Sequence, residues 1–213
     1  MKENNSQDIQ KYILRRRYPN PFRSALLVID MQNYFLPIAD SIMDNVISVI
    51  TTCREQGIKV IYTRHGHKDI ATDGGMLWQW WGESVIYGSN DWSLFGSLPV
   101  QNNDLIIDKK RYSAFHGTKL SLYLQALGLN EIIITGVLTN CCCETTARDA
   151  FIRDYRVFFM SDATATINQD LHLSSLKNLA FGFAYVLNKN ELMDSFGPKR
   201  YRGPNCDNLI TTP

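Results

Sequence analysis

The sequence predicts an α/β fold, specifically a three-layer α/β/α Rossmann-like fold with a central, mostly parallel six-stranded sheet. From Ser24 onward, short apolar runs alternate with longer amphipathic stretches, the order expected of βαβ units. The apolar runs are continuous, which indicates strands that are covered on both faces. A length of 213 residues fits one hydrophobic core. We therefore expect an N-terminal arm at residues 1–23 and one domain at residues 24–213.

Six runs rich in β-branched and apolar residues are the predicted strands. They lie at 25–29, 59–63, 105–107, 131–135, 157–160 and 183–187.

Four amphipathic stretches between these runs predict helices, at 42–56, 118–127, 145–152 and 171–181. Gly57 and Gly128 follow the first two, and glycine is typical of the position just after a helix. The arm at residues 1–23 is polar and carries three consecutive arginines, so we expect it to be a solvated extension.

Charge and cysteine content exclude several classes of function. The charges of the 22 basic and 21 acidic side chains nearly cancel, and the sequence lacks a basic stripe with interleaved aromatic residues. We therefore expect neither nucleic acid nor a membrane surface as a partner. No apolar run approaches the ~20 residues that span a bilayer. Five cysteines, three of them consecutive, form neither a disulfide framework nor a CxxC zinc site, which favours a reducing, cytoplasmic location.

Three chemically distinctive residues lie at or just beyond the carboxyl ends of predicted strands. Asp30 follows the strand at 25–29, Lys109 closes the strand near 107, and Cys142 comes one short turn after the strand at 131–135. Ligands bind at this edge of open parallel sheets. Taken singly, Asp30 is equally well explained as a turn-capping residue, and a lysine leaving a strand is usually just solvated.

The cysteine triplet is the most specific of these signals. Thr139 and Asn140 are candidates for the N-cap of a following helix, which would place Cys142 in the first turn. Unpaired amides and the helix dipole there favour a thiolate, and a nearby lysine would lower the thiol pKa further. We expect Cys141 and Cys143 to be packing residues.

Four segments carry a family resemblance: ALLVIDMQNYF at 25–35, KKRYSAFHGT at 109–118, GVLTNCCCETTARDAF at 136–151 and DATAT at 162–166. With these motifs, the chain resembles isochorismatase-like cysteine hydrolases from residue 24 to about residue 187. The resemblance implies the corresponding three-layer hydrolase fold.

By motif position, the resemblance implies a general acid/base at Asp30 and a nucleophile at Cys142. Lys109 takes the lysine role because it stands three residues before Tyr112, and Lys110 is the alternative. The thiol points to the amidase branch, which includes nicotinamidases and ureidoacrylate and biuret-type hydrolases, whereas isochorismatases cleave a vinyl ether and can dispense with a thiol.

The resemblance also implies a cis peptide at Val137-Leu138, with the Leu138 and Cys142 backbone N–H groups forming an oxyanion hole. The expected function is hydrolysis of a C–N amide-type bond in a small molecule through a cysteine thioester, and the chain looks most like plant-type nicotinamidases and their bacterial relatives. Isochorismatase-type or ureidoacrylate/biuret-type hydrolysis, a non-catalytic binding protein and a redox sensor remain alternatives. Relatives suggest a homodimer or homotetramer.

For substrate binding we expect Phe35, Trp81 and Tyr112 as an aromatic lining, with His67 beside them. Core packing is nearly as good an explanation for the aromatic residues. The tryptophan-rich segment at 78–81 is expected to be a glycine-flanked loop, serving either as a lid or as a subunit contact.

Metal-dependent nicotinamidases carry an Asp-x-His pair followed by a further histidine. Here His65 replaces the aspartate, His67 matches the first histidine, and the next histidine, His116, lies in the lysine motif. We therefore expect no metal and no cofactor, and we expect His65 and His67 to rim the pocket.

Overall fold

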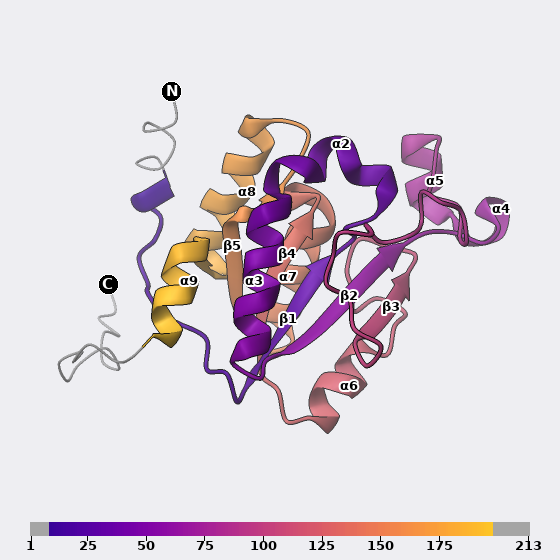
Figure 1. Cartoon of the computed structure of the whole chain (residues 1–213). Helices are drawn as coiled ribbons and strands as arrows, with labels where there is room; N and C mark the ends of the chain where they lie inside the picture. The colour runs from indigo at the N-terminus through magenta and orange to yellow at the C-terminus, as the bar shows by residue number, and fades with distance from the viewer. Residues whose placement is uncertain (1–8, 198–213) are drawn as a thin grey trace.

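A computed structural model describes residues 9–197, which form one six-stranded sheet between two layers of helices (Figure 1). The strand order is β3-β2-β1-β4-β5-β6, and every pairing is parallel. The strands are β1 Ser24–Ile29, β2 Lys59–His65, β3 Leu105–Lys109, β4 Glu131–Val137, β5 Arg156–Ala165 and β6 Tyr185–Leu187. All six predicted strands are present, and the predicted fold is confirmed.

Helices cover both faces of this sheet (Figure 1). One face is covered by α3 Met43–Glu55 and α9 Lys189–Phe196. The other is covered by α6 Leu120–Ala126, α7 Glu144–Ile152 and α8 Gln169–Gly182. The shorter elements are η1 Asn33–Phe35, α2 Leu36–Ala39, η2 Asp40–Ile42, α4 Ile70–Asp73, α5 Gly75–Trp81 and η3 Thr139–Cys143.

The central strand β1 shows why both faces must be covered. Its side chains are fully buried and alternate between two core clusters, because successive residues of a strand point to opposite faces. Ala25, Leu27 and Ile29 belong to the cluster under α6, α7 and α8, whereas Leu26 and Val28 belong to the cluster under α3 and α9.

After β3, at the edge of the sheet, the chain returns to the centre and forms β4 on the other side of β1, so the switch point lies between β1 and β4. Strands β1 to β3 run outward from this point in one direction, and β4 to β6 run outward in the other. Such a switch point leaves a crevice outside the carboxyl ends of the two strands, where ligands bind in this class of fold. The residues that follow β1 and β4 therefore face a common site.

The predicted helices and their ends agree with the structure to within a few residues. Gly57 and Gly128 follow α3 and α6 with φ angles of 74° and 65°, the left-handed conformation that favours glycine. The tryptophan-rich segment at 78–81 was wrongly expected to be a loop. It lies in helix α5, which Gly82 ends with a φ of 69°.

Residues 33–55 form a nearly continuous helical run that is long and apolar enough, by length and composition, to cross a membrane. The expectation that no segment reaches this limit is therefore wrong. The core helix of a globular protein passes the same test, and Val46, Val49 and Ile50 of α3 are fully buried against the sheet.

The N-terminal arm is not a solvated extension over its described part, residues 9–23. Ile9, Tyr12 and Ile13 pack against the core cluster under α8. The Arg16 guanidinium lies 2.7 Å from the Glu191 carboxylate on α9. Residues 1–8 and 198–213, including Cys206, lie outside the described part.

Gly136 allows β1 and β4 to approach closely at the switch point. It pairs with Ile29, has a φ of 114°, and a Cβ atom placed on it would lie 2.1 Å from the Ile29 carbonyl oxygen. A side chain at this position would push the two strands apart just before Asp30 and Leu138.

Gly136→Ala should lower the free energy of unfolding by at least about 2 kcal/mol, because a steric clash adds to an unfavourable φ. Gly57→Ala is the matched control, since its φ is also positive but nothing lies within 4 Å of the added Cβ. It should cost about 1 kcal/mol. Urea unfolding followed by circular dichroism measures both, and equal losses would show that close packing at Gly136 is unimportant.

Candidate active site

A buried ion pair joins the carboxyl ends of β1 and β3. The Lys109 Nζ atom lies 2.6 Å from Asp30 Oδ2, and both side chains have no solvent-exposed surface. Strand β2 lies between β1 and β3, so the pair crosses over the end of a third strand. Buried charges of this kind are tolerated only when they are paired and hydrogen-bonded.

Thr63, near the end of β2, completes the surroundings of Asp30 and was not identified from the sequence. Its hydroxyl donates a hydrogen bond to Asp30 Oδ1 at 2.6 Å and accepts one from the Asp30 N–H at 3.1 Å. Asp30 itself has a φ of 48°, which is uncommon for a residue other than glycine. A hydroxyl residue near the end of an otherwise apolar strand was the available sequence signal.

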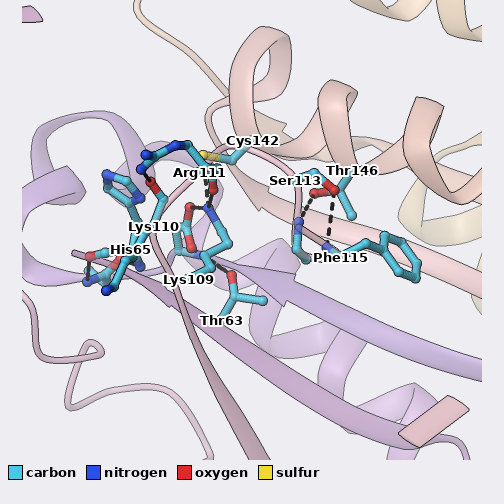
Figure 2. A network of polar contacts seen from close by, with 12 residues as sticks. Thr63, His65, Lys109, Lys110, Arg111, Ser113, Phe115, Cys142 and Thr146 are labelled. Carbon is cyan, nitrogen blue, oxygen red and sulfur yellow. Dashed lines mark hydrogen bonds and ion pairs between the residues drawn. The ribbon is translucent and has the colours of Figure 1, made fainter. Parts of the chain in front are cut away.

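Cys142 lies beside the same lysine. Lys109 Nζ donates to Cys142 Sγ at 3.3 Å and to the Arg111 carbonyl oxygen at 3.1 Å (Figure 2). Together with the ion pair to Asp30, these contacts give the ammonium group three close partners. The sequence-predicted residues Asp30, Lys109 and Cys142 therefore meet, although they are far apart in the chain.

The neighbouring Lys110 points elsewhere. Its side chain is half-exposed, and its Nζ lies 3.0 Å from Asp73 Oδ2. Successive side chains at a strand end diverge, so only Lys109 reaches the buried site. The structure thus brings Lys109, and not the alternative Lys110, to Asp30 and Cys142.

The segment that carries Cys142 is a π-helical turn, η3, between β4 and α7. The peptide between Val137 and Leu138 is cis, as the resemblance implied. The Leu138 carbonyl accepts hydrogen bonds from the Cys141 and Cys143 amides, each at 3.1 Å. Single turns of this kind are rare and frequently occur at functional sites.

Thr139 and Asn140 do not cap a helix, contrary to expectation, because Leu138 holds the N-cap position and no side chain bonds there. The Thr139 hydroxyl lies 2.9 Å from His172 Nδ1 on α8, and Asn140 Oδ1 accepts a hydrogen bond from the Thr166 hydroxyl at 2.6 Å. These side chains instead connect η3 to α8 and to Thr166, the residue after β5.

Electrostatics at the site correct the expectation of a lowered thiol pKa. Burial raises the pKa of Cys142, the charge of Lys109 acts in the opposite direction, and Asp30 adds to the increase. Burial by itself would lower the pKa of Lys109, but the charge of Asp30 raises it above its ordinary value, and the hydrogen bond to Cys142 adds to the increase. At neutral pH the lysine is therefore charged and the cysteine rests as a thiol.

A cavity of about 380 Å³ opens above these residues. Three of its wall residues were predicted from the sequence: Phe35, Trp81 and Tyr112. The Trp81 Nε1–H donates to the Tyr112 hydroxyl at 2.7 Å, which joins helix α5 to the lysine motif. The wall is mostly apolar; its other members are Tyr34, Pro37, Ile38, His65, Leu77, Glu83, Ser84, Val85, Leu138, Asn140, Cys141, Cys142, Thr166, Ile167 and Leu171.

His67 was expected at this cavity, and the structure places it elsewhere. Its side chain is buried behind the wall, with Nδ1 at 2.5 Å from the Ser84 hydroxyl and Nε2 at 3.2 Å from the Lys110 carbonyl oxygen. His65 lines the cavity instead. Side chains at 63 and 65 share one face of β2, and the strand ends at His65, so the alternation does not extend to His67.

The two histidines do not fit a metal site. Both ring nitrogens of His67 already have partners, and burial together with the charge of Lys109 lowers the pKa of His65 to about 3. Between residues 9 and 197, no three His, Cys, Asp or Glu side chains gather where they could hold a metal ion.

Comparisons with known proteins agree with this fold. Residues 24–191 match the model of the isochorismatase domain. Nicotinamidase 3 of Arabidopsis thaliana is 46% identical over 193 residues, which cover 89% of this chain and 97% of that protein. Enterobactin synthase component B of Escherichia coli (strain K12) is 34% identical over 81% of this chain and 63% of that protein.

A solved structure gives the same result. The crystal structure of a cysteine hydrolase from Pseudomonas syringae pv. phaseolicola 1448A has a TM-score of 0.81 and 30% sequence identity, and covers 85% of this chain and 95% of that one. The sequence motifs, the sheet topology and these similarities agree. The chain therefore belongs to the isochorismatase family and is a hydrolytic enzyme.

Proposed function

We propose that this enzyme hydrolyses the C–N bond of a small aromatic carboxamide, of the nicotinamide type, through a thioester on Cys142. The observation that carries the proposal is the position of Lys109 Nζ, 2.6 Å from the Asp30 carboxylate and 3.3 Å from the Cys142 sulfur, at a mostly apolar cavity. A nucleophile, an acid/base and a fixed positive charge in one place are the requirements of covalent acyl transfer.

In the first half of the proposed reaction, the Asp30 carboxylate takes the thiol proton of Cys142 as the sulfur attacks the amide carbon. Proton transfer must accompany attack, because burial holds the thiol pKa above its ordinary value. The Leu138 and Cys142 amides stabilise the oxyanion that forms on the carbonyl oxygen. The protonated Asp30 then gives its proton to the departing nitrogen, and ammonia leaves.

In the second half, Asp30 removes a proton from water, and the resulting hydroxide attacks the thioester carbon. Collapse of this intermediate breaks the C–S bond and releases the acid, and the sulfur recovers the proton from Asp30. Lys109 keeps a positive charge beside the carboxylate and the sulfur throughout, which favours each negatively charged form in turn.

The cavity supports an aromatic substrate. Phe35, Trp81 and Tyr112 offer aromatic rings to a flat molecule, and a volume of about 380 Å³ lies within the usual range of small-molecule sites. The similarity to Nicotinamidase 3 over most of both chains points to the same substrate class.

Two rivals have less support. A redox sensor needs a thiol that ionises easily and is accessible, but burial raises the pKa of Cys141, Cys142 and Cys143 alike. A non-catalytic binding protein has no need of the buried pair of Asp30 and Lys109 beside a cysteine, since burying charges costs free energy.

We also propose a reducing, cytoplasmic location and a homodimer or homotetramer. Cys53 and the cysteine triplet are free thiols, which supports the first proposal. Exposed Met76, Trp80 and Ile152 gather around a second surface groove, and exposed apolar clusters of this kind are typical of subunit contacts.

An ammonia-release screen tests the proposed activity. Nicotinamide and pyrazinamide should be hydrolysed, whereas ureidoacrylate and biuret should give slower release under the same conditions. Hydrolysis of ureidoacrylate or biuret in preference to the aromatic amides would contradict the proposed substrate class.

Cys142→Ala should reduce kcat by at least about a thousandfold while leaving the fold intact, because it removes the nucleophile. Cys143→Ala is the matched control, since it removes a buried thiol from the next residue of the same turn. Cys143→Ala should keep most of the activity. Initial rates and circular dichroism are measured together, and residual turnover in Cys142→Ala close to that of the wild type would end the covalent mechanism.

Lys109→Met should lower kcat by orders of magnitude and slow alkylation of Cys142 by iodoacetamide at a given pH. The lysine lowers the thiol pKa against the effect of burial, so its loss moves the alkylation profile to higher pH. Lys110→Met is the control, because that side chain is half-exposed and pairs with Asp73. A profile shifted by Lys110→Met and unchanged in Lys109→Met would reverse the assignment.

A further inference from the structure

Over the described part of the chain, the wall of the cavity has one acidic side chain and no lysine or arginine, although the positive charge of Arg111, whose guanidinium donates to the Asp73 and Lys110 carbonyl oxygens, reaches His65. Among its described wall residues, Glu83 is the one carboxylate. His65 is neutral because burial and the charge of Lys109 lower its pKa to about 3. At the cavity floor, the charges of Asp30 and Lys109 cancel, and Cys142 is a thiol.

The position of Glu83 is fixed by Tyr34, which lies on the same wall. The Tyr34 hydroxyl donates a hydrogen bond to Glu83 Oε1 at 2.8 Å. Burial and this bond raise the pKa of Tyr34 to about 12, so the hydroxyl keeps its proton at any physiological pH. Glu83 itself is exposed, which places its carboxylate at the rim, where solvent and salt weaken its field.

The proposed reaction changes the charge of what occupies this cavity. A neutral carboxamide and water become a carboxylate and an ammonium ion, once the released acid loses its proton and ammonia gains one. Substrate and product are nearly equal in size and shape. A negative charge at the rim is therefore a feature that separates them, because it acts on the acid and not on the neutral amide.

We propose that Glu83, held by Tyr34, is a specificity-determining residue that repels carboxylates. It weakens binding of the acid product, which limits product inhibition, and it disfavours substrates that carry a carboxylate of their own. This inference rests on the proposed amide hydrolysis for its biological meaning. Its physical content, discrimination between a neutral ligand and its acid, can be measured without turnover.

The test compares Glu83 with Glu83→Gln by titration calorimetry, both in the Cys142→Ala background so that nicotinamide is not consumed, using nicotinamide and nicotinate as the neutral and acidic ligands. The quantity of interest is the ratio of their dissociation constants. At low ionic strength, Glu83→Gln should favour nicotinate by about threefold or more relative to nicotinamide, which is the size expected for one partly screened charge. The difference should shrink in about 1 M salt. Product inhibition of ammonia release by nicotinate should strengthen in parallel.

Glu55→Gln is the matched control. Glu55 is the last residue of α3, which leads into the start of β2. It therefore lies at the amino ends of the strands, whereas the cavity lies at their carboxyl ends. This variant loses the same charge and should keep the wild-type ratio. An equal change in Glu55→Gln would show that net charge matters and that Glu83 has no special role.

Tyr34→Phe supplies a second measurement, since it frees the Glu83 carboxylate without removing it. It should give a smaller shift of the ratio than Glu83→Gln. An unchanged ratio in Glu83→Gln at low salt would overturn the inference. If wild type released no ammonia from any amide while Glu83→Gln still bound nicotinate more tightly, the proposed function would fail and the charge selection would stand.

Discussion

The ion pair between Asp30 and Lys109 is the constraint on which the site depends. Removing two charges from water costs several kcal/mol per ion, and only close pairing and further hydrogen bonds offset that cost. Thr63 and the Arg111 carbonyl provide those bonds on the two sides. The pair consequently fixes the ends of three strands, and Cys142 meets a lysine whose position is already determined.

In the proposed mechanism, the same pair allows a buried thiol to serve as the nucleophile. Burial alone would leave Cys142 inert, because a thiolate is poorly solvated there. The Lys109 cation, at hydrogen-bond distance from the sulfur, stabilises the thiolate in place of water. The Asp30 carboxylate beside it can accept the thiol proton. The proposed chemistry therefore requires all three side chains together, because the buried cysteine alone would be unreactive.

Much of the fold could be predicted because its signals are local. Apolar runs located all six strands, and glycines marked two helix ends. The tryptophans of α5 misled because aromatic residues have only moderate helix propensity and glycine precedes and follows them. The second half of β5, residues 161–165, is too polar to read as a buried strand, although it pairs with β4 in the structure.

The site was predictable only where a motif fixed the position. The roles proposed for Asp30, Lys109 and Cys142 followed from strand ends and family resemblance. The choice between His65 and His67 depended on where β2 ends, which the sequence does not specify. The sequence did not point to Glu83, because its proposed role depends on the absence of other charged side chains from the described residues of the cavity wall, which only the structure reveals.

The lysine of the site belongs to β3, one of the two strands of the sheet that have a single neighbour. Strand β3 is at the edge of the sheet and pairs with β2 alone, whereas β1 and β4 are paired on both sides. Edge elements open at a lower free energy than central ones. Fraying of β3 would withdraw Lys109 from its partners while the core stayed folded. If the proposed role of Lys109 is right, heating that opens β3 would stop catalysis at a temperature below that at which the core unfolds.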